Sequence, residues 1–218
     1  MQTPPVPPKF PTLPIFPLGT VLFPYVGLPL RIFEPRYRDL TRDCLNGDRR
    51  FGIVLIERGS EVGGGDDRFE VGTVARIVGA EVAEDGQALL MTVGEERFRI
   101  RRWLDGTLYP RAEVEYFADA TSLTERNESI PATVNRLTKR MRRALAMQAE
   151  LNIPGPPSTV EFSSDVEQCL WQLCAVVPGQ RHDDLALLST PTVERRLALI
   201  EQLLDSSDAN ANRLLNGL

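Results

Sequence analysis

Lysine, histidine and long apolar runs are scarce in this 218-residue chain. The only lysines are Lys9 and Lys139, and the only histidine is His182. No stretch approaches the roughly 20 apolar residues that a membrane span needs. The N-terminus also lacks the basic start and apolar core of a signal peptide. We therefore expect a cytoplasmic protein that does not interact with a membrane.

The three cysteines, Cys44, Cys169 and Cys174, are an odd number at irregular spacing. This pattern indicates no disulfide framework and fits a reducing compartment. A four-ligand zinc site would need all three cysteines and His182, whereas such sites usually have paired ligands at close spacing. We expect no metal and no other cofactor, and we interpret the cysteines as small buried hydrophobic side chains.

Motifs for catalysis are missing as well. A Walker A motif needs a glycine directly before its lysine, and neither lysine of this chain follows a glycine. The glycines at 63–65 are followed by two aspartates that would repel phosphate, so we interpret them as a hairpin tip. His182-Asp183-Asp184 with Ser189 could form a hydrolytic triad, but no nucleophile elbow surrounds the serine. We prefer a polar loop before a helix, and we expect no enzyme.

The net charge of −5 is mild and mixed in sign, which does not favour a general nucleic-acid binder. One basic stretch with adjacent aromatic residues keeps RNA binding open as an alternative. It contains Arg97, Arg99, Arg101 and Arg102. Strand alternation would place the first three on a solvent-facing side, next to two glutamates. A solvated sheet face is therefore the preferred interpretation. A second basic cluster around Arg140 is expected to pair with neighbouring carboxylates.

The first half of the sequence predicts strands. Short runs rich in valine, isoleucine and phenylalanine are separated by turn residues. They cover 13–16, 28–33, 51–56, 72–82, 88–93, 97–103 and 109–116. One helix is expected over 35–45, where Tyr37, Leu40 and Cys44 recur at helical spacing. A mostly antiparallel, closed or half-closed barrel would bury these strands and protect their edges.

The second half predicts three amphipathic helices that pack as a small bundle. Ser122 with Glu125 forms a capping-box pattern before the first, which should reach about Leu151. Ser164 with Glu167 forms the same pattern before the second. Thr190, which precedes a proline, should open the third.

These patterns together predict an α+β protein. The expected organisation is a flexible proline-rich tail over 1–11, a β-barrel subdomain over 12–118, a helical bundle over 119–208 and a C-terminal tail over 209–218.

The run LPIFPLGTVLFP over 13–24, continued by LPLRIFEPRY over 28–37, resembles the opening of the Lon substrate-binding domain family. Further stretches agree with this resemblance: 51–56, 71–77, 94–100, taken as a hairpin, and 184–197. The resemblance implies a PUA-like pseudo-barrel followed by a helical bundle, in a family associated with recognising polypeptides for degradation. Without a Walker A motif or a Ser-Lys peptidase pair, the chain resembles the stand-alone members of that family.

A polypeptide-binding module should expose apolar and aromatic side chains, because unfolded clients present such groups. The candidate residues are Phe23, Tyr25, Val26, Leu28, Phe33, Arg36 and Tyr37. The expected partners are unfolded polypeptides or a protein, which could be a protease. Replacing Tyr25 or Tyr37 by alanine should then weaken binding and leave the thermal midpoint nearly unchanged. The alternative is that these residues form the core of the barrel and its seam with the helix.

Overall fold

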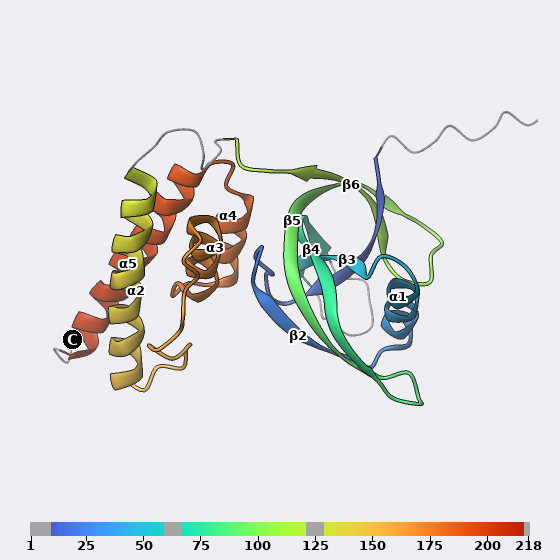
Figure 1. The fold of residues 1–218 in the computed structure, drawn as a ribbon, viewed down its shortest axis with the longest axis horizontal. Helices are drawn as coiled ribbons and strands as arrows, with labels where there is room; N and C mark the ends of the chain where they lie inside the picture. The colour runs from blue at the N-terminus through green and yellow to red at the C-terminus, as the bar shows by residue number, and fades with distance from the viewer. Residues whose placement is uncertain (1–9, 59–66, 121–128, 216–218) are drawn as a thin grey trace, which may run out of the picture. The chain divides into compact units, whose positions relative to one another are not determined.

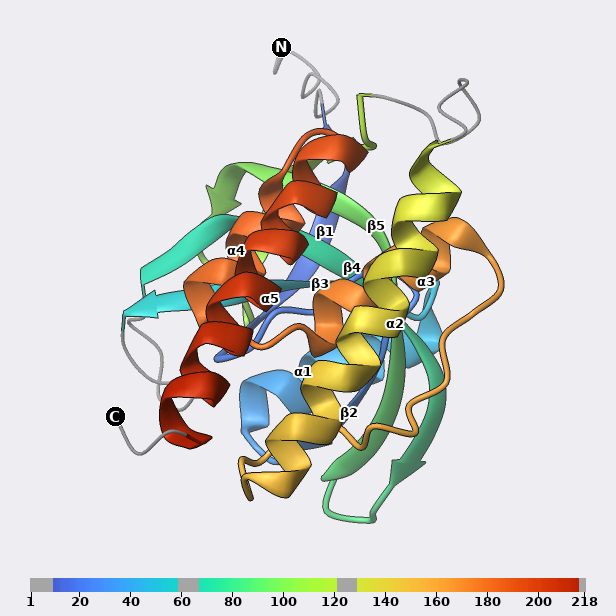
Figure 2. The ribbon, with the colours of Figure 1, turned by 90° about the vertical axis from the view of Figure 1, so that its left-hand side faces the viewer.

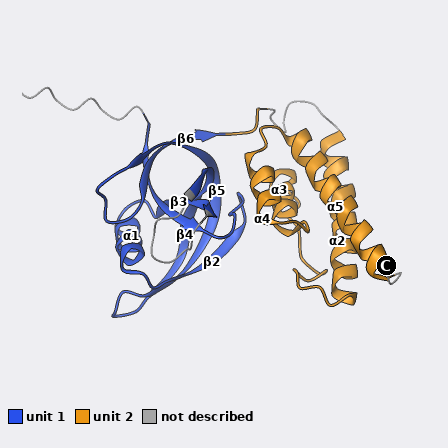
Figure 3. Cartoon of the chain, turned by 180° about the vertical axis from the view of Figure 1, so that it is seen from behind, with its two compact units in different colours: residues 1–117 blue, residues 118–218 orange. Residues whose placement is uncertain are grey.

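The structure, a computed structural model, describes residues 10–58, 67–120 and 129–215 of the chain (Figure 1). The chain divides into two compact units, Met1–Phe117 and Ala118–Leu218 (Figure 3). The first unit contains the strands and the second contains helices.

The strands of the first unit form an irregular, mostly antiparallel pseudo-barrel. Its elements are β1 (Thr12–Leu18), β2 (Gly27–Ile32), α1 (Pro35–Asn46), β3 (Arg50–Arg58), β4 (Asp67–Val82), β5 (Ala88–Leu104) and β6 (Arg111–Phe117). The sheet order is β2-β5-β4-β3-β1-β6, and an additional pairing of β5 with β6 closes five of the strands into a circuit. Only the β1–β3 pair is parallel among the strand pairs described. The predicted fold class is therefore confirmed.

Strand β5 is longer than the sequence suggested, because the hairpin expected over 94–100 does not exist. The chain continues as one strand of 17 residues, and the pairing with β4 shifts register beside Gly94. A side chain at Gly94 would come within 2.1 Å of the Phe23 carbonyl oxygen. Glycine here allows close approach of the loop before β2 and marks a bulge, not a turn.

Two hydrophobic clusters hold the first unit together. One lies inside the circuit and takes residues from all five of its strands, with the Phe98 ring fully buried among them. An added Cβ at Gly52 or Gly72 would come within 2.5 Å or 2.7 Å, respectively, of the Phe98 Cζ atom. These glycines therefore make room for the ring.

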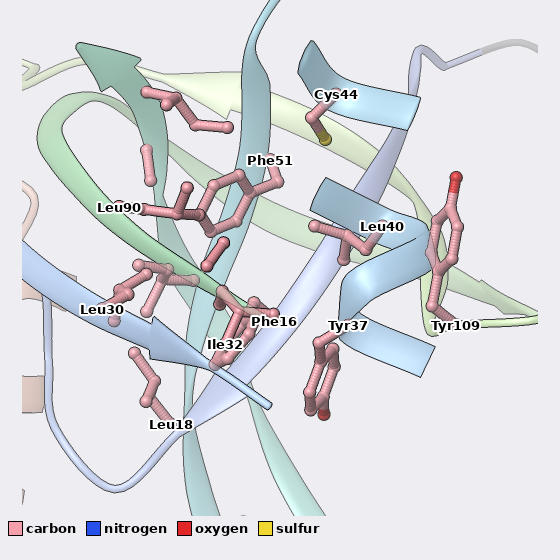
Figure 4. Packing of buried hydrophobic residues seen from close by; sticks show 14 of the residues in the cluster. Phe16, Leu18, Leu30, Ile32, Tyr37, Leu40, Cys44, Phe51, Leu90 and Tyr109 are labelled. Carbon is pink, nitrogen blue, oxygen red and sulfur yellow. The ribbon is translucent and has the colours of Figure 1, made fainter. Parts of the chain in front are cut away.

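The second cluster lies between the strands and α1 (Figure 4). Tyr37, Leu40 and Cys44 are buried on one face of α1, as their spacing predicts. The ring centroids of Tyr37 and Phe16 are 4.2 Å apart. The helix thus covers a sheet face that would otherwise expose large apolar side chains.

The described part of the second unit contains four helices, one more than predicted. They are α2 (Ser129–Glu150), α3 (Val166–Val176), α4 (Arg181–Ser189) and α5 (Val193–Leu215). The polar loop expected around His182 is helix α4, which begins with a capping box between Gln180 and Asp183. Sequence reasoning missed it because glutamine is an unusual N-cap residue.

Other helix boundaries also differ from those predicted. Helix α3 is capped by Asp165, whose Oδ1 accepts from the Gln168 N–H at 2.9 Å, and not by the preceding serine. Thr190 ends α4 and does not open α5. Helix α5 continues to Leu215, into the range expected to be a tail. The Ser122–Glu125 pattern lies outside the described residues.

Helices α2 and α5 lie side by side (Figures 1 and 2). Ion pairs join them: Arg136 contacts Glu201 at 2.7 Å, and Arg140 contacts both Asp205 and Asp208 at 2.6 Å. The pairing expected for Arg140 is therefore confirmed. These hydrogen-bonded carboxylates raise the pKa of the Arg140 guanidinium.

Candidate functional site

The seven residues predicted to form a binding surface do not share one environment. Phe23 and Tyr37 each have only 3% of their surface exposed. The Arg36 guanidinium lies 4.5 Å from the centroid of the Tyr37 ring and forms an ion pair with Glu34. Leu28 is partly buried against the core cluster. Tyr37, Phe23 and Leu28 are therefore packed into the first unit, as the alternative interpretation expects, and do not form an exposed binding surface.

Tyr25 is exposed, at 43%, on a loop that the backbone fixes firmly. Its N–H donates to the Gly94 carbonyl oxygen at 2.8 Å, and the Gly94 N–H donates to Val26 O at 3.0 Å. Tyr25 has a φ of 61°, a left-handed conformation that is uncommon for residues other than glycine. Such strain tends to occur at functional sites. The loop thus holds an aromatic side chain at the surface in a fixed position.

Phe33 is the second exposed aromatic residue of the set, at 47%. It follows the end of β2, whereas Tyr25 precedes its beginning. The two side chains therefore flank the two ends of one six-residue strand.

Sequence reasoning missed an exposed apolar surface on the sheet formed by β2, β5 and β4. We call it the apolar strip and define it as Pro29, Val78, Leu89 and Met91. The exposed fractions of the last three are 53%, 56% and 47%. Pro29 and Met91 are directly paired across β2 and β5. Val78 is the extra residue of a bulge in β4, beside the Gly79–Met91 pair.

The sequence of β5 contains the alternation that predicts this strip, but neighbouring apolar residues obscure it. Exposed Leu89 and Met91 alternate with buried Leu90 and Thr92, which is the pattern of a sheet with one solvent-facing side. Because residues 88–91 are all apolar, the sequence alone does not show which side of the strand faces solvent. Exposed apolar residues grouped on one surface are typical of interaction sites.

The arginines proposed as an alternative nucleic-acid patch are largely committed to contacts inside the first unit. Arg97 is 3% exposed and packs over the Phe117 ring at 4.5 Å, so its predicted place on the solvent face is wrong. Arg99 also lies over that ring, at 5.5 Å. Arg101 pairs with a glutamate of β6.

Arg102 completes this arrangement. Its Nη2 lies 2.6 Å from a carboxylate oxygen of Glu113, and this hydrogen bond raises the pKa of the guanidinium. The face therefore alternates positive and negative charge across β5 and β6. A surface of this kind attracts phosphate weakly, because Arg101 and Arg102 are already paired with carboxylates.

An open pocket of about 340 Å³ lies beside the loop between β5 and β6. The Arg68 guanidinium stacks over the Trp103 ring, 4.8 Å from its centroid, at this pocket. Its other lining residues are Arg36, Leu104, Asp105, Gly106, Thr107, Leu108, Tyr109 and Pro110. It is too open and polar to hold a small apolar ligand tightly.

Catalytic and metal-binding groups do not converge in the part of the chain that the structure describes. No cluster of three potential metal ligands occurs there. The three cysteines, all in the described part of the chain, are buried as expected and form no disulfide, and burial raises the pKa of Cys44 to about 12. His182 and Ser189 lie at opposite ends of α4, a separation of about 10 Å along the axis. Among the residues that the structure describes, no helix is long and apolar enough to cross a membrane.

Comparison with solved structures defines the fold as that of a Lon N-terminal domain. A crystal structure of a Lon N-terminal domain protein from Xanthomonas campestris is similar with a TM-score of 0.61 and 29% identity, covering 89% of this chain and 98% of that one. The N-terminal domain of a Mycobacterium avium complex Lon protease shares the fold, with a TM-score of 0.60, 15% identity and coverage of 89% and 98%.

The sequence model of the ATP-dependent protease La (LON) substrate-binding domain matches residues 12–206, so the chain belongs to this family. Similar proteins include the Lon protease of Cytophaga hutchinsonii, 27% identical over 76% of this chain and 24% of that protein. Lon protease 2 of Myxococcus xanthus is 29% identical over 88% of this chain and 23% of that protein. The chain thus spans about a quarter of the length of these relatives.

Proposed function

We propose that this chain is a non-catalytic module that binds polypeptide segments through the apolar strip, with Tyr25 and Phe33 at its margins. The observation that carries the proposal is the exposed row of Pro29, Val78, Leu89 and Met91 on a sheet whose other face is buried. Membership of a family described as a substrate-binding domain supports it. Proteolysis or protein quality control is the context that this family suggests.

The chemistry of the strip suits weak and reversible capture. Full burial of one leucine or methionine side chain contributes about 1.5–3 kcal/mol. Two such residues offset only part of the entropic cost of association. Methionine also adapts to differently shaped partners because its side chain is flexible and polarisable. The module would therefore accept many apolar segments without strong preference for one sequence.

The test is a fluorescence-anisotropy titration of the protein against a labelled, chemically unfolded polypeptide at two salt concentrations. We expect saturable binding that persists at high salt, because apolar contacts are not screened by ions. Unlabelled RNA should not displace the polypeptide. Displacement by RNA at low salt would instead support the arginine face as a nucleic-acid site and reject the proposal.

The double variant L89S/M91S tests whether the apolar strip is the binding surface. It should weaken binding at least tenfold, because it removes the two largest side chains of the strip. Leu108→Ser is the matched control, since Leu108 is 75% exposed but lies in the turn between β5 and β6. Equal losses in both proteins would mean that the strip is not the binding surface.

A further inference from the structure

Strand β2 is an edge strand, because among the described residues its only strand partner is β5 (Figure 1). An edge strand carries N–H and C=O groups that point away from the sheet. Gly27, Pro29 and Arg31 of this strand are all exposed. These three residues of the edge strand are therefore accessible to solvent.

The register shows which backbone groups point outward. The Gly94 N–H donates to Val26 O at 3.0 Å, which makes the adjacent Gly27–Val93 pair a non-hydrogen-bonded pair. Pairs alternate along an antiparallel ladder, so the residues opposite Met91 and Leu89 are also in non-hydrogen-bonded pairs. The backbone groups of Gly27, Pro29 and Arg31 consequently face the open edge.

This edge offers three acceptors and two donors. Gly27 and Arg31 present both an N–H and a C=O, whereas Pro29 presents only its C=O because proline has no N–H. The side chains of Pro29 and Arg31 lie on the outer face, beside Met91 and Leu89 respectively. A strand added at this edge would place alternate side chains next to the apolar strip.

We propose that the module binds its clients as an added β-strand along the open edge of β2, with alternate apolar side chains of the client extending the apolar strip. This inference rests on the proposed function and specifies how the client backbone is held. Tyr25 and Phe33 then lie near the two ends of the bound segment. Strand β2 has six residues, which span about 20 Å in extended form, so the client segment would be about six residues long.

An external polypeptide fits this edge better than a second copy of the same strand. A client that contains no proline supplies an N–H to each of the three outward carbonyls. Two β2 strands placed together would each lack the N–H of Pro29, so the shared ladder would lose donors. Proline in an edge strand is a known means of discouraging self-pairing. The edge is therefore selective against its own copy.

The test measures amide hydrogen exchange by NMR with a labelled peptide of alternating valine and threonine that carries a lysine at each end. At saturation, the N–H groups of Gly27 and Arg31 should exchange at least tenfold more slowly than in the free protein. Binding without this protection would overturn strand addition and leave the proposed function standing. If the peptide did not bind but the unfolded polypeptide still did, strand addition would also be overturned and the proposed function would stand. If neither probe bound, both proposals would be wrong.

A proline substitution provides the second measurement. Arg31→Pro removes one outward donor and should weaken peptide binding about fivefold, the equivalent of one net hydrogen bond. Arg31→Ala removes the same side chain but keeps the N–H, so it should bind within twofold of the unmodified protein. Equal affinities of the two variants would overturn the proposal. So would protection that rises with protein concentration in the absence of peptide, since a second copy would then occupy the edge.

Discussion

Arg196 and Asp119 form a two-point ion pair, with both guanidinium–carboxylate distances at 2.7 Å. Arg196 is completely buried, and its guanidinium stacks over the Trp171 ring at 3.9 Å from the centroid. It also donates to the carbonyl oxygens of Leu187 at 3.1 Å and Thr190 at 2.8 Å. One side chain thus connects α3, α4, α5 and the segment that follows β6.

Replacing Arg196 by methionine should destabilise the second unit severely. The substitution removes both hydrogen bonds from the guanidinium to the Asp119 carboxylate and those to two carbonyl oxygens. Breaking one partner of a buried ion pair costs about 3–5 kcal/mol. Urea unfolding followed by circular dichroism measures this loss.

The neighbouring Arg195→Met is the control for that experiment. Arg195 is exposed on the same helix, so its replacement should change the free energy of unfolding by less than about 0.5 kcal/mol. If the two variants unfolded at the same urea concentration, the ion pair would have no structural importance.

Tyr25→Ala should weaken binding and Tyr37→Ala should lower stability, although both residues were predicted to lie on one binding surface. Tyr25 is exposed, so its loss should weaken polypeptide binding with little change in the thermal midpoint. Tyr37 is buried against Phe16, and truncating a buried aromatic side chain costs about 3–5 kcal/mol. Differential scanning calorimetry with the anisotropy titration separates the two effects. A stable Tyr37→Ala protein would contradict the burial of this ring.

The contrast between these tyrosines shows where sequence reasoning reached its limit. The spacing of Tyr37, Leu40 and Cys44 predicted α1 correctly, and the same spacing marks the buried face of that helix. It therefore argued against placing Tyr37 on a binding surface. Tyr25 gave no such signal, because its exposure depends on hydrogen bonds to Gly94, 69 positions away in the sequence.

The apolar strip was missed for a related reason. Local composition predicts that Leu89 and Met91 lie in a strand, but it does not show which face of that strand is covered. That depends on the pairing of β5 with β2 and β4, which are set by long-range register. By contrast, the barrel and bundle classes follow from hydrophobic period alone, which changes from two to 3.6 after β6.

Gly72→Ala tests the packing inside the circuit of strands. The added Cβ would lie 2.2 Å from the Ile53 carbonyl oxygen and 2.7 Å from the Phe98 ring. Because backbone cannot move aside easily in a sheet, we expect a loss of at least about 2 kcal/mol in the free energy of unfolding. Chemical denaturation measures it.

Gly79→Ala is the control in the same strand. The nearest atom to its added Cβ is 3.6 Å away, which is ordinary van der Waals contact. Its free energy of unfolding should change by less than about 0.5 kcal/mol. Equal destabilisation at the two positions would mean that glycine is required in β4 for backbone freedom and not for space.

The free energy of unfolding of the first unit should fall at alkaline pH because Tyr109 then loses its proton. Burial, followed by a 2.8 Å hydrogen bond to Asp43 and the charge of that carboxylate, raises the pKa of the phenol to about 12. The folded protein therefore keeps a proton that the unfolded chain releases near pH 10. The stabilisation is fully present below pH 10 and is lost as the pH rises toward 12.

Thermal midpoints of the unmodified protein and of Tyr109→Phe, measured from pH 8 to pH 11, isolate this contribution. Contributions from other ionisable groups are common to both proteins and cancel in the difference. The midpoint of the unmodified protein should fall more steeply above pH 10, because phenylalanine has no proton to release. Parallel curves would mean that Tyr109 ionises equally in the folded and unfolded states, which its hydrogen bond to Asp43 contradicts.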